Sequence, residues 1–280
     1  MNPLRMWVRR LALLSVLFAA GHAAAQIAVS PQMLDLEVEQ AAATNAFRIY
    51  NETSETKRVR VSLSSWDKDE GNRVRDLPPG PLGLERWTVI SPLDFELAPG
   101  TSQAVRFALR PPVELPPGEH RLMLYLNEET PIPHGQAATT LNVRFRIGAA
   151  IYVHAGAVER RGDVHSIKAT PGALLFDLTT TGNATTRLAG QYVVYPAGAF
   201  PGAGKVPKVE RVAAADALRP AGAVAVGALP GISVLPQARR SVPLDLAAHG
   251  LAAGRYIVAI SGQFGDTPVD ATVEYVAPAK

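Results

Sequence analysis

The chain of 280 residues contains no cysteine, so neither disulfide bonds nor thiolate metal sites hold its fold together. Beyond the first 25 residues it also has no long apolar run, so we expect no membrane-spanning helix in the remainder. Stability must therefore come from packed hydrophobic cores. A remainder of about 255 residues has room for one large or two ordinary domains, each able to bury a core unaided.

The first 25 residues have the three parts of a secretory signal peptide. A basic start with three arginines precedes the apolar stretch Leu11–Ala20, and the small residues Ala23–Ala25 follow. The apolar stretch is too short for a membrane span, which needs roughly 20 residues. We predict a signal peptide at 1–25, cleavage before Gln26, and a periplasmic protein without membrane insertion after signal cleavage.

The basic charge of the sequence is misleading because it resides in this segment. The formal net charge is +3, with 28 Lys and Arg against 25 Asp and Glu, and the pI is about 9.3. Three arginines and no acidic residue leave with the signal peptide, so the net charge of the remainder is about zero. No basic block with interleaved aromatic residues occurs. We therefore expect no nucleic-acid partner.

The sequence lacks the motifs of enzymes and metal sites. No G-x-S-x-G elbow occurs, and Gly202–Val206 has the wrong spacing for a phosphate-binding loop. Acidic residues such as Asp67, Asp69 and Glu70 fall at a predicted turn, where solvated charge is routine. The histidines after the signal peptide stand singly, without metal-ligand spacing. They are His120, His134, His154, His165 and His249. We predict no enzymatic activity, no metal and no cofactor.

Seven segments of the first half have β-strand character and are separated by Gly, Pro, Asn or Asp turn formers. They are 27–38, 45–51, 57–66, 86–96, 102–109, 119–128 and 139–153. No stretch of this half has convincing helical periodicity with caps. Seven short strands in about 125 residues predict an immunoglobulin-like β-sandwich.

The second half also has β character, but its composition shifts toward Ala, Gly, Val and Pro. Its predicted strands are 164–170, 173–180, 187–195, 206–213, 239–247, 254–263 and 268–277. The Ala/Gly/Pro-rich segment 196–236 predicts long loops, and its role is left open. Residues 216–226 are compatible with a helical turn as well as with a loop. We predict an all-β chain with an N-terminal domain at 26–153 and a C-terminal β-sandwich domain at 158–280.

The most informative segment is Thr139–Val153, in which apolar and polar residues alternate with period two. The apolar residues of its first part are Leu141, Val143, Phe145 and Ile147. Such alternation predicts a long strand with one apolar face. Because an exposed apolar strand invites pairing, this pattern in a secreted protein favours a strand that is lent to another chain. The alternative is an ordinary last core strand whose apolar face is buried in its own sandwich.

Several motifs accompany this strand in a fixed order. The most specific are L-x-P-G-x-x-Q-x-V-R at Leu97–Arg106 and L-P-x-G-E-x-R at Leu115–Arg121. The others are Ala28–Pro31, Tyr50-Asn51, Trp66 and Ser91-Pro92. With these motifs the first half resembles the periplasmic chaperones of the chaperone/usher pilus system, most closely their archaic and atypical branches. The second half resembles them only in its β character and position.

This resemblance implies two immunoglobulin-like β-sandwich domains in tandem, arranged as a boomerang. It implies a chaperone that stabilises pilus or fimbrial subunits lacking their last strand and delivers them to an outer-membrane usher. The strand at 139–153 would be laid into the groove of the subunit, with four apolar plugs. The plugs are Leu141, Val143, Phe145 and Ile147. Such a chaperone needs no nucleotide and no cofactor.

Two positions depart from the family pattern. Well-studied members carry an arginine in the first strand and a lysine late in the last strand, and this pair anchors the terminal carboxylate of the subunit. The present chain has Asp35 and Ala150 at the matching positions. The sign of their charge makes Arg106, Arg121 and Arg146 candidate carboxylate anchors. The alternative for all three is an ordinary surface or structural role.

Two other functions are compatible with the same β-rich sequence. A structural or adhesive surface protein would reuse the sandwich pair with its last strand internally paired and without chaperone activity. A carbohydrate-binding or carbohydrate-processing accessory would gather aromatic residues at loop tips. The dispersed tyrosines and Trp66 and Trp87 do not clearly supply such a cluster.

Overall fold

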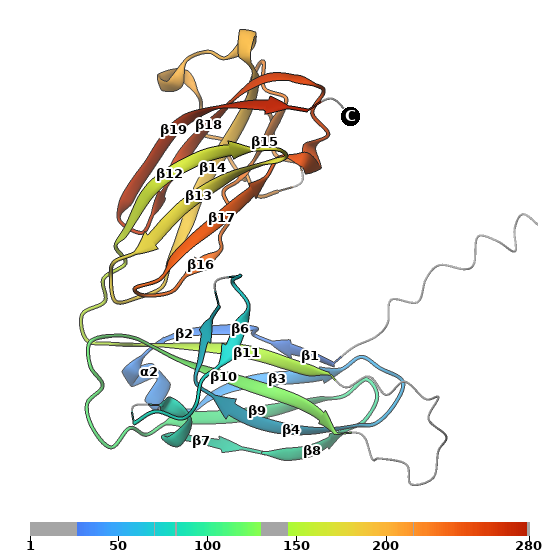
Figure 1. Cartoon of the computed structure of the whole chain (residues 1–280). Helices are drawn as coiled ribbons and strands as arrows, with labels where there is room; N and C mark the ends of the chain where they lie inside the picture. The colour runs from blue at the N-terminus through green and yellow to red at the C-terminus, as the bar shows by residue number, and fades with distance from the viewer. Residues whose placement is uncertain (1–26, 70, 82, 130–144, 215, 279–280) are drawn as a thin grey trace, which may run out of the picture.

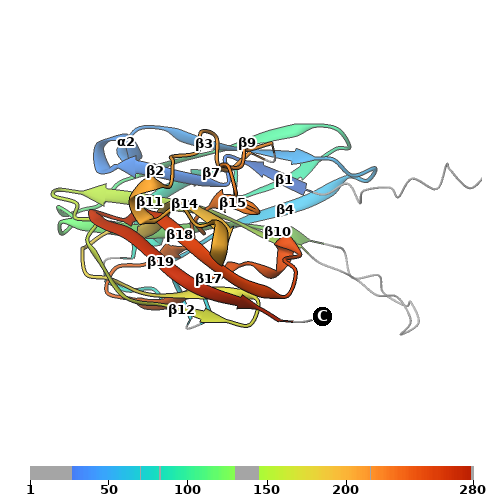
Figure 2. The same cartoon turned by 90° about the horizontal axis from the view of Figure 1, so that it is seen from above.

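The computed structural model describes residues 27–69, 71–81, 83–129, 145–214 and 216–278. The predicted signal peptide and the predicted plugs Leu141 and Val143 lie outside these residues. The described chain forms two β-sandwiches, which confirms the all-β prediction (Figure 1). In Figure 1 the sandwiches meet at one end and their long axes diverge, so that the molecule is bent. In the view from above, the second sandwich largely overlaps the first (Figure 2).

The first sandwich consists of a four-stranded and a five-stranded sheet. The four-stranded sheet has the order β1 (Ile27–Ser30), β3 (Asn45–Asn51), β9 (Ser102–Leu109), β7 (Thr88–Ser91). The five-stranded sheet has the order β2 (Met33–Glu37), β11 (Arg146–Ala155), β10 (Gly118–Glu129), β4 (Lys57–Ser64), β8 (Asp94–Leu97). A separate hairpin of β5 (Trp66–Lys68) and β6 (Val74–Asp76) stands off this sandwich toward the second one (Figure 1).

Two predicted strands of this half are each divided between the sheets. The segment 27–38 becomes β1 and β2, and the segment 86–96 becomes β7 and β8. Each division occurs beside a proline, Pro31 or Pro92, which has no N–H to continue a ladder. The predicted strand 27–38 also ends early, because Val38–Ala42 forms the short helix α2 with a capping box at Glu37 and Gln40. One further turn of helix, η1, spans Leu84–Arg86.

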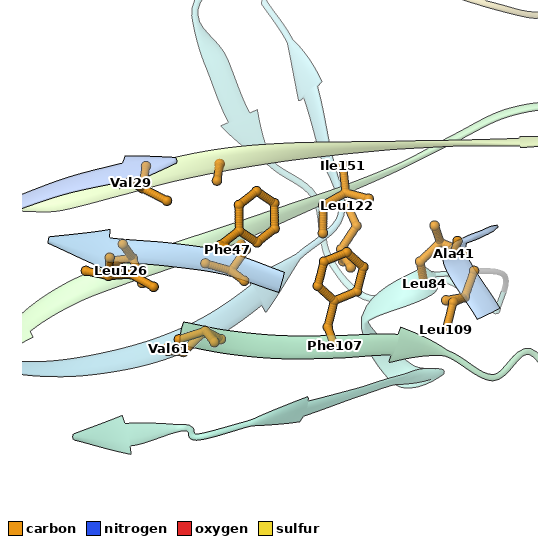
Figure 3. Close-up of a cluster of buried hydrophobic side chains, with 14 of the residues drawn as sticks. Val29, Ala41, Phe47, Val61, Leu84, Phe107, Leu109, Leu122, Leu126 and Ile151 are labelled. Carbon is orange, nitrogen blue, oxygen red and sulfur yellow. The ribbon is translucent and has the colours of Figure 1, made fainter. Parts of the chain in front are cut away.

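The core of the first sandwich is built from the inward residues of both sheets. Phe47 and Phe107 stack with their ring centroids 5.6 Å apart, and Leu122 and Ile151 of the opposite sheet pack nearby (Figure 3). Phe47 is fully buried, and Ile151 is 1% exposed. Since burial of a large apolar side chain contributes roughly 1.5–3 kcal/mol, this cluster accounts for stability without disulfides.

The second sandwich has its own core. One sheet has the order β12 (Gly162–Thr170), β13 (Ala173–Thr180), β17 (Arg239–Asp245). The other has the order β15 (Ala225–Ala228), β14 (Thr186–Pro196), β18 (Gly254–Phe264), β19 (Thr267–Ala277), and β16 (Ser233–Val234) pairs with β14. Phe176, Val194 and Phe264 are fully buried between the sheets. Along the chain the first core ends at Ala155, and the second core begins at Val164. The predicted domain limits, 26–153 and 158–280, stay a prediction.

The predicted strand at 206–213 is wrong. After the short turns η2 (Ala197–Ala199) and η3 (Ala203–Lys205), this segment is a loop, and a side chain of β14 binds it. Gln191 donates a hydrogen bond to Pro207 O and accepts one from Val209 N, both at 2.8 Å. The buried amide of Gln191 thus bonds to backbone groups of the loop that a neighbouring strand would bond to if the segment were a strand. The described part of 216–226 forms no helix, and the last short turn, η4, spans Ala247–His249.

Candidate strand-pairing site

The edge of β11 is covered along only part of its length. On one side β10 pairs with the whole strand, from Arg146 opposite Asn127 to Ala155 opposite Gly118. On the other side β2 pairs in parallel, beginning only at Ala150 opposite Met33. Within the described chain, the registers give residues 146–149 no neighbour on that second side. Among the described residues, β11 therefore has an open edge over its first four residues.

Backbone direction identifies the groups that this open edge offers. Phe145 O accepts a hydrogen bond from Glu128 N at 3.0 Å, on the β10 side. Ala150 N donates to Gln32 O at 3.1 Å, on the β2 side. Because alternate residues of a strand direct their backbone groups to opposite sides, Arg146 and Gly148 direct theirs to the β2 side, like Ala150. Their N–H and C=O groups are the ones that a further strand would meet.

The apolar residues on one face of β11 become less buried toward the start of the strand, where the open edge lies. Ala149, Ile151 and Val153 are at most 1% exposed, Ile147 is partly buried against the same core, and Phe145 is 41% exposed. All five share one strand face. The second part of the strand is thus an ordinary core strand. The assignment of Phe145 and Ile147 as plugs stays a prediction, as does that of Leu141 and Val143 beyond the described residues.

The motif at Leu115–Arg121 fixes the second sandwich to the first. Glu119 accepts hydrogen bonds from Thr185 N at 2.8 Å and Thr185 Oγ1 at 2.6 Å, and its side chain is only 2% exposed. Gly118 has a φ of 126°, and a Cβ there would lie 3.0 Å from Asn183 O. The glycine therefore permits a close approach of the two domains that any other residue would strain. Charge-assisted hydrogen bonds donated to this buried carboxylate make the joint stiff.

The three arginines predicted as carboxylate anchors do not come together. Arg121 donates to Glu119 at 3.0 Å, and Arg146 donates to Asp76 at 2.7 Å. Arg106 is exposed on β9, in the opposite sheet of the sandwich. Two of the three are therefore already engaged with a carboxylate of the chain itself.

The two positions at which the family pattern is broken have structural roles. Asp35 contacts the Nε2 atom of His154, which is 2% exposed and lies 3.2 Å from Nη2 of Arg160. Ala150 packs against an apolar cluster on the face of β11 that contacts the second sandwich. This cluster consists of Trp66, Met123, Tyr125, Tyr152 and Leu235 and joins the two sandwiches. A small residue at 150 leaves room for it.

Sequence reasoning missed a cluster of three cations beside this cluster, which we call the cleft cations: Lys68, Arg187 and Arg240. Lys68 Nζ donates to Ser233 Oγ at 2.6 Å, and Arg240 Nη2 donates to Lys68 O at 2.9 Å. Arg187 lies over the ring of Tyr152, 5.7 Å from its centroid. Burial lowers the pKa of Lys68, and the positive charges of Arg187 and Arg240 lower it further. Among the described residues, no ion pair involves any of these three cations.

An open cleft of about 820 Å³ lies between the β5–β6 hairpin and residues 236–240 of the second sandwich. Lys68, Arg73, Arg75, Arg239 and Arg240 line it. Its acidic residues Asp67 and Asp69 are paired with Arg75 and Arg73 at 3.2 and 2.9 Å. Counted over its described lining residues, the cleft is net positive, and its chemistry suits an anion.

The described part of the chain contains no group of three His, Asp or Glu side chains placed to hold a metal ion. Among those residues, no helix has the length and apolarity needed to cross a membrane. The arrangement at β11 therefore offers backbone pairing, apolar contact and positive charge. These are means of binding a polypeptide.

Comparison with known proteins found no matching family model and no matching curated protein. Similar solved structures include the CsuC–CsuE chaperone–tip adhesion subunit complex of Acinetobacter baumannii, at 12% identity and a TM-score of 0.44 over 91% of this chain and 100% of that chain. The E. coli chaperone DraB has 14% identity and a TM-score of 0.42, over 91% and 97% of the two chains. The Salmonella enterica SafA pilin–SafB chaperone complex has 13% identity and a TM-score of 0.42, over 91% and 98%. All three TM-scores are below 0.5, so the fold assignment rests on the sheets described above.

Proposed function

We propose that this chain is a non-enzymatic periplasmic chaperone that captures pilus or fimbrial subunits and delivers them to an outer-membrane usher. The observation that carries the proposal is the open edge of β11 at residues 146–149, next to the exposed ring of Phe145. The two motifs at Leu97–Arg106 and Leu115–Arg121 support it through their resemblance to this family. An unpaired strand edge that continues an apolar stripe is suited to completing the sheet of another protein.

Capture proceeds by strand addition. A subunit that lacks its last strand pairs its own edge with the outward backbone groups of Arg146 and Gly148. Phe145 enters the open core of the subunit, followed by Val143 and Leu141, and each plug contributes roughly 1.5–3 kcal/mol. Backbone pairing accepts many subunits, whereas the spacing of the plugs sets the register. Exchange of the donated strand with that of the next subunit releases the cargo.

The cleft cations complete the site as an anchor for the terminal carboxylate of the subunit. Lys68, Arg187 and Arg240 repel one another, because no acidic partner neutralises them within the described chain. A carboxylate bound among them relieves this repulsion and forms charge-assisted hydrogen bonds. We place the anchor here rather than at Arg121 or Arg146, since Glu119 and Asp76 already engage those arginines.

The alternative is a structural or adhesive surface protein without chaperone activity. It is favoured by the pairing of Ala150–His154 on both sides, as in an ordinary core strand. It gives no role to the open edge or to the exposed Phe145. The chaperone proposal accounts for both features.

The test is protection of a pilin-like subunit that lacks its last strand. The subunit is refolded by dilution in the presence of the purified chain, and its aggregation is followed by light scattering. Phe145→Ser combined with Val143→Ser should abolish protection and co-purification while leaving the thermal midpoint of the chain unchanged. Val89→Ser is the matched control, since Val89 is 65% exposed on β7 of the other sheet. Full protection by the double variant would overturn the proposal.

A further inference from the structure

The beginning of β11 is held from outside its own sheet by the β5–β6 hairpin. Asp76, the last residue of β6, accepts a hydrogen bond from Nη2 of Arg146 at 2.7 Å. Its other carboxylate oxygen accepts one from the hydroxyl of Tyr125 at 2.5 Å. The guanidinium of Arg146 also lies over the ring of Tyr125, 3.4 Å from its centroid. Asp76 thus binds one residue of β11 and one residue of its neighbour β10.

The electrostatics of this contact agree with its geometry. Partial burial raises the pKa of Asp76, but hydrogen bonds from Tyr125 and Arg146 outweigh it and hold that pKa below its ordinary value. Burial and the hydrogen bond to Asp76 raise the pKa of Tyr125 to about 12. The carboxylate is therefore ionised, and the phenol is protonated at neutral pH. Each is in the form that the pair of hydrogen bonds requires.

The contact of Asp76 with Arg146 lies at the start of β11, where the strand has its open edge. Residues 146–149 have one strand neighbour rather than two within the described chain, and a strand end with one neighbour frays more readily. Arg146 is the first residue of β11. A contact that holds its side chain against Tyr125 also holds its backbone in register with Asn127 of β10. Within the same hairpin, Lys68 bonds to Ser233, so the hairpin itself is fixed to the second sandwich.

We propose that Asp76 is a positioning residue for subunit capture: its carboxylate holds Arg146 and Tyr125 so that the open edge of β11 is presented extended and in register. The inference rests on the proposed function of that edge. A strand edge that is already ordered binds a partner without a further entropic cost. If only a fraction of the molecules has an ordered edge, the apparent affinity for the subunit falls in proportion to that fraction.

The free protein supplies the first test. In Asp76→Asn the ion pair is lost while the shape of the side chain is kept. The amide of Glu128, which donates to Phe145 O, should then exchange its hydrogen about fivefold faster, because the start of β11 opens more often. The amide of Val61, which donates to Leu93 O in the same sandwich, should be unchanged. Faster exchange at both amides would mean general destabilisation and would overturn the inference.

Matched variants separate positioning from a general role of the hairpin. Asp67→Asn removes a comparable ion pair of the hairpin, to Arg75 at 3.2 Å, which does not contact β11. It should leave exchange at Glu128 unchanged. Arg146→Gln should reproduce Asp76→Asn, and the double variant should be no worse than either single one. Additive effects would contradict a shared contact.

The second test uses capture of a strand-deficient pilin-like subunit, measured as an apparent dissociation constant. Asp76→Asn should weaken capture about fivefold. Glu274→Gln, which removes the exposed ion pair of Glu274 with Arg255 in the second sandwich, should leave capture unchanged. Unchanged exchange and capture in Asp76→Asn would overturn the positioning role, while capture by the unmodified chain would still support the proposed function. Failure of the unmodified chain to capture any such subunit would overturn the proposed function and with it the positioning role.

Discussion

Ala150 faces Met33 in the parallel pairing of β11 with β2, and this pair marks the point at which the edge of β11 becomes covered. Beyond it, up to His154, the strand is bonded on both sides, and Ile151 and Val153 belong to the core of the first sandwich. Before it, residues 146–149 have only β10 beside them within the described chain. One strand thus combines a core segment and an open segment.

Proline substitution distinguishes these two segments. Ala150→Pro removes the hydrogen bond to Gln32 O and should lower the free energy of unfolding by about 1–3 kcal/mol. Gly148→Pro should cost much less, since the N–H that it removes faces the open side and proline is tolerated at strand edges. A Cβ at position 148 would lie 2.9 Å from Met123 Sδ, and the flexible side chain of Met123 can move away from it. Urea denaturation measures both values, and equal costs would contradict an open edge at Gly148.

Glu119 should be the most sensitive residue of the joint between the sandwiches. Glu119→Ala leaves Arg121 and the amide of Thr185 without their buried partner and should cost roughly 2–4 kcal/mol. The angle between the sandwiches should also become broader, as measured by small-angle X-ray scattering. Glu114→Ala, at an exposed position of the same segment, is the control and should change neither quantity. A scattering profile unaffected by Glu119→Ala would contradict a stiff joint.

The anchor proposal predicts that the cleft cations matter for a subunit with a free terminal carboxylate. Arg187→Gln combined with Arg240→Gln should weaken capture of that subunit at least tenfold, since each lost charge-assisted bond is worth about 1.5–3 kcal/mol. Capture of the same subunit with an amidated terminus should be weak in the unmodified chain and insensitive to the substitutions. Arg106→Gln, on the opposite sheet, is the control. If the amidated subunit is captured equally well, the cleft cations are no carboxylate anchor.

Lys68 should leave a signature in the pH dependence of stability. Burial and then the charges of Arg187 and Arg240 lower its pKa in the folded protein, below the value of about 10.4 in the unfolded chain. Protonated Lys68 therefore destabilises the fold at neutral pH, and this cost disappears as the pH rises from the folded toward the unfolded pKa. The stability of Lys68→Met relative to the unmodified chain should be most favourable near pH 7 and decline toward pH 10.

Lys57 is the control for this measurement because its pKa shifts in the opposite direction. Hydrogen bonds to Glu128 and then to Glu55 raise the pKa of Lys57, so its contribution is lost only above its unfolded value. The stability of Lys57→Met relative to the unmodified chain should be constant between pH 7 and about pH 10. Thermal midpoints across this range measure both differences. A flat profile for Lys68→Met would contradict a strained cation at that position.

Much of the fold was predictable because strand patterns are local. The segments 45–51, 102–109 and 173–180 coincide with β3, β9 and β13, in which alternate residues face a core. The assignment of a strand to one sheet or the other is not local. The divisions at Pro31 and Pro92 therefore required the structure, although the prolines themselves marked the positions.

The error at 206–213 has a physical reason. A strand was predicted there, but the backbone groups of Pro207 and Val209 are bonded to the side chain of Gln191. The sequence of this loop contains no pattern that indicates a hydrogen bond to a side chain on a strand elsewhere in the chain. Alternation of apolar and polar residues identifies the two faces of a strand, but it does not show whether the backbone is bonded to a neighbouring strand or to a side chain.

The candidate site was predictable only in part for a similar reason. The alternation of 139–153 pointed to β11, but the limit of its open edge depends on where β2 begins in the parallel register. The cleft cations come from β5, β14 and β17 and meet only in the folded chain. Likewise, Arg146 was an anchor candidate by its charge, while its partner Asp76 lies 70 residues away in sequence.

Hydrogen exchange at Arg146 and Gly148, measured with and without a bound strand-deficient subunit, tests the central claim most directly. In the free chain their amides should exchange rapidly, whereas the amide of Ala150, bonded to Gln32 O, should be protected. On capture, Arg146 and Gly148 should become at least as protected as Ala150, because the edge of the subunit takes the place that β2 leaves open. A complex in which both amides still exchange as in the free chain would contradict strand donation by β11.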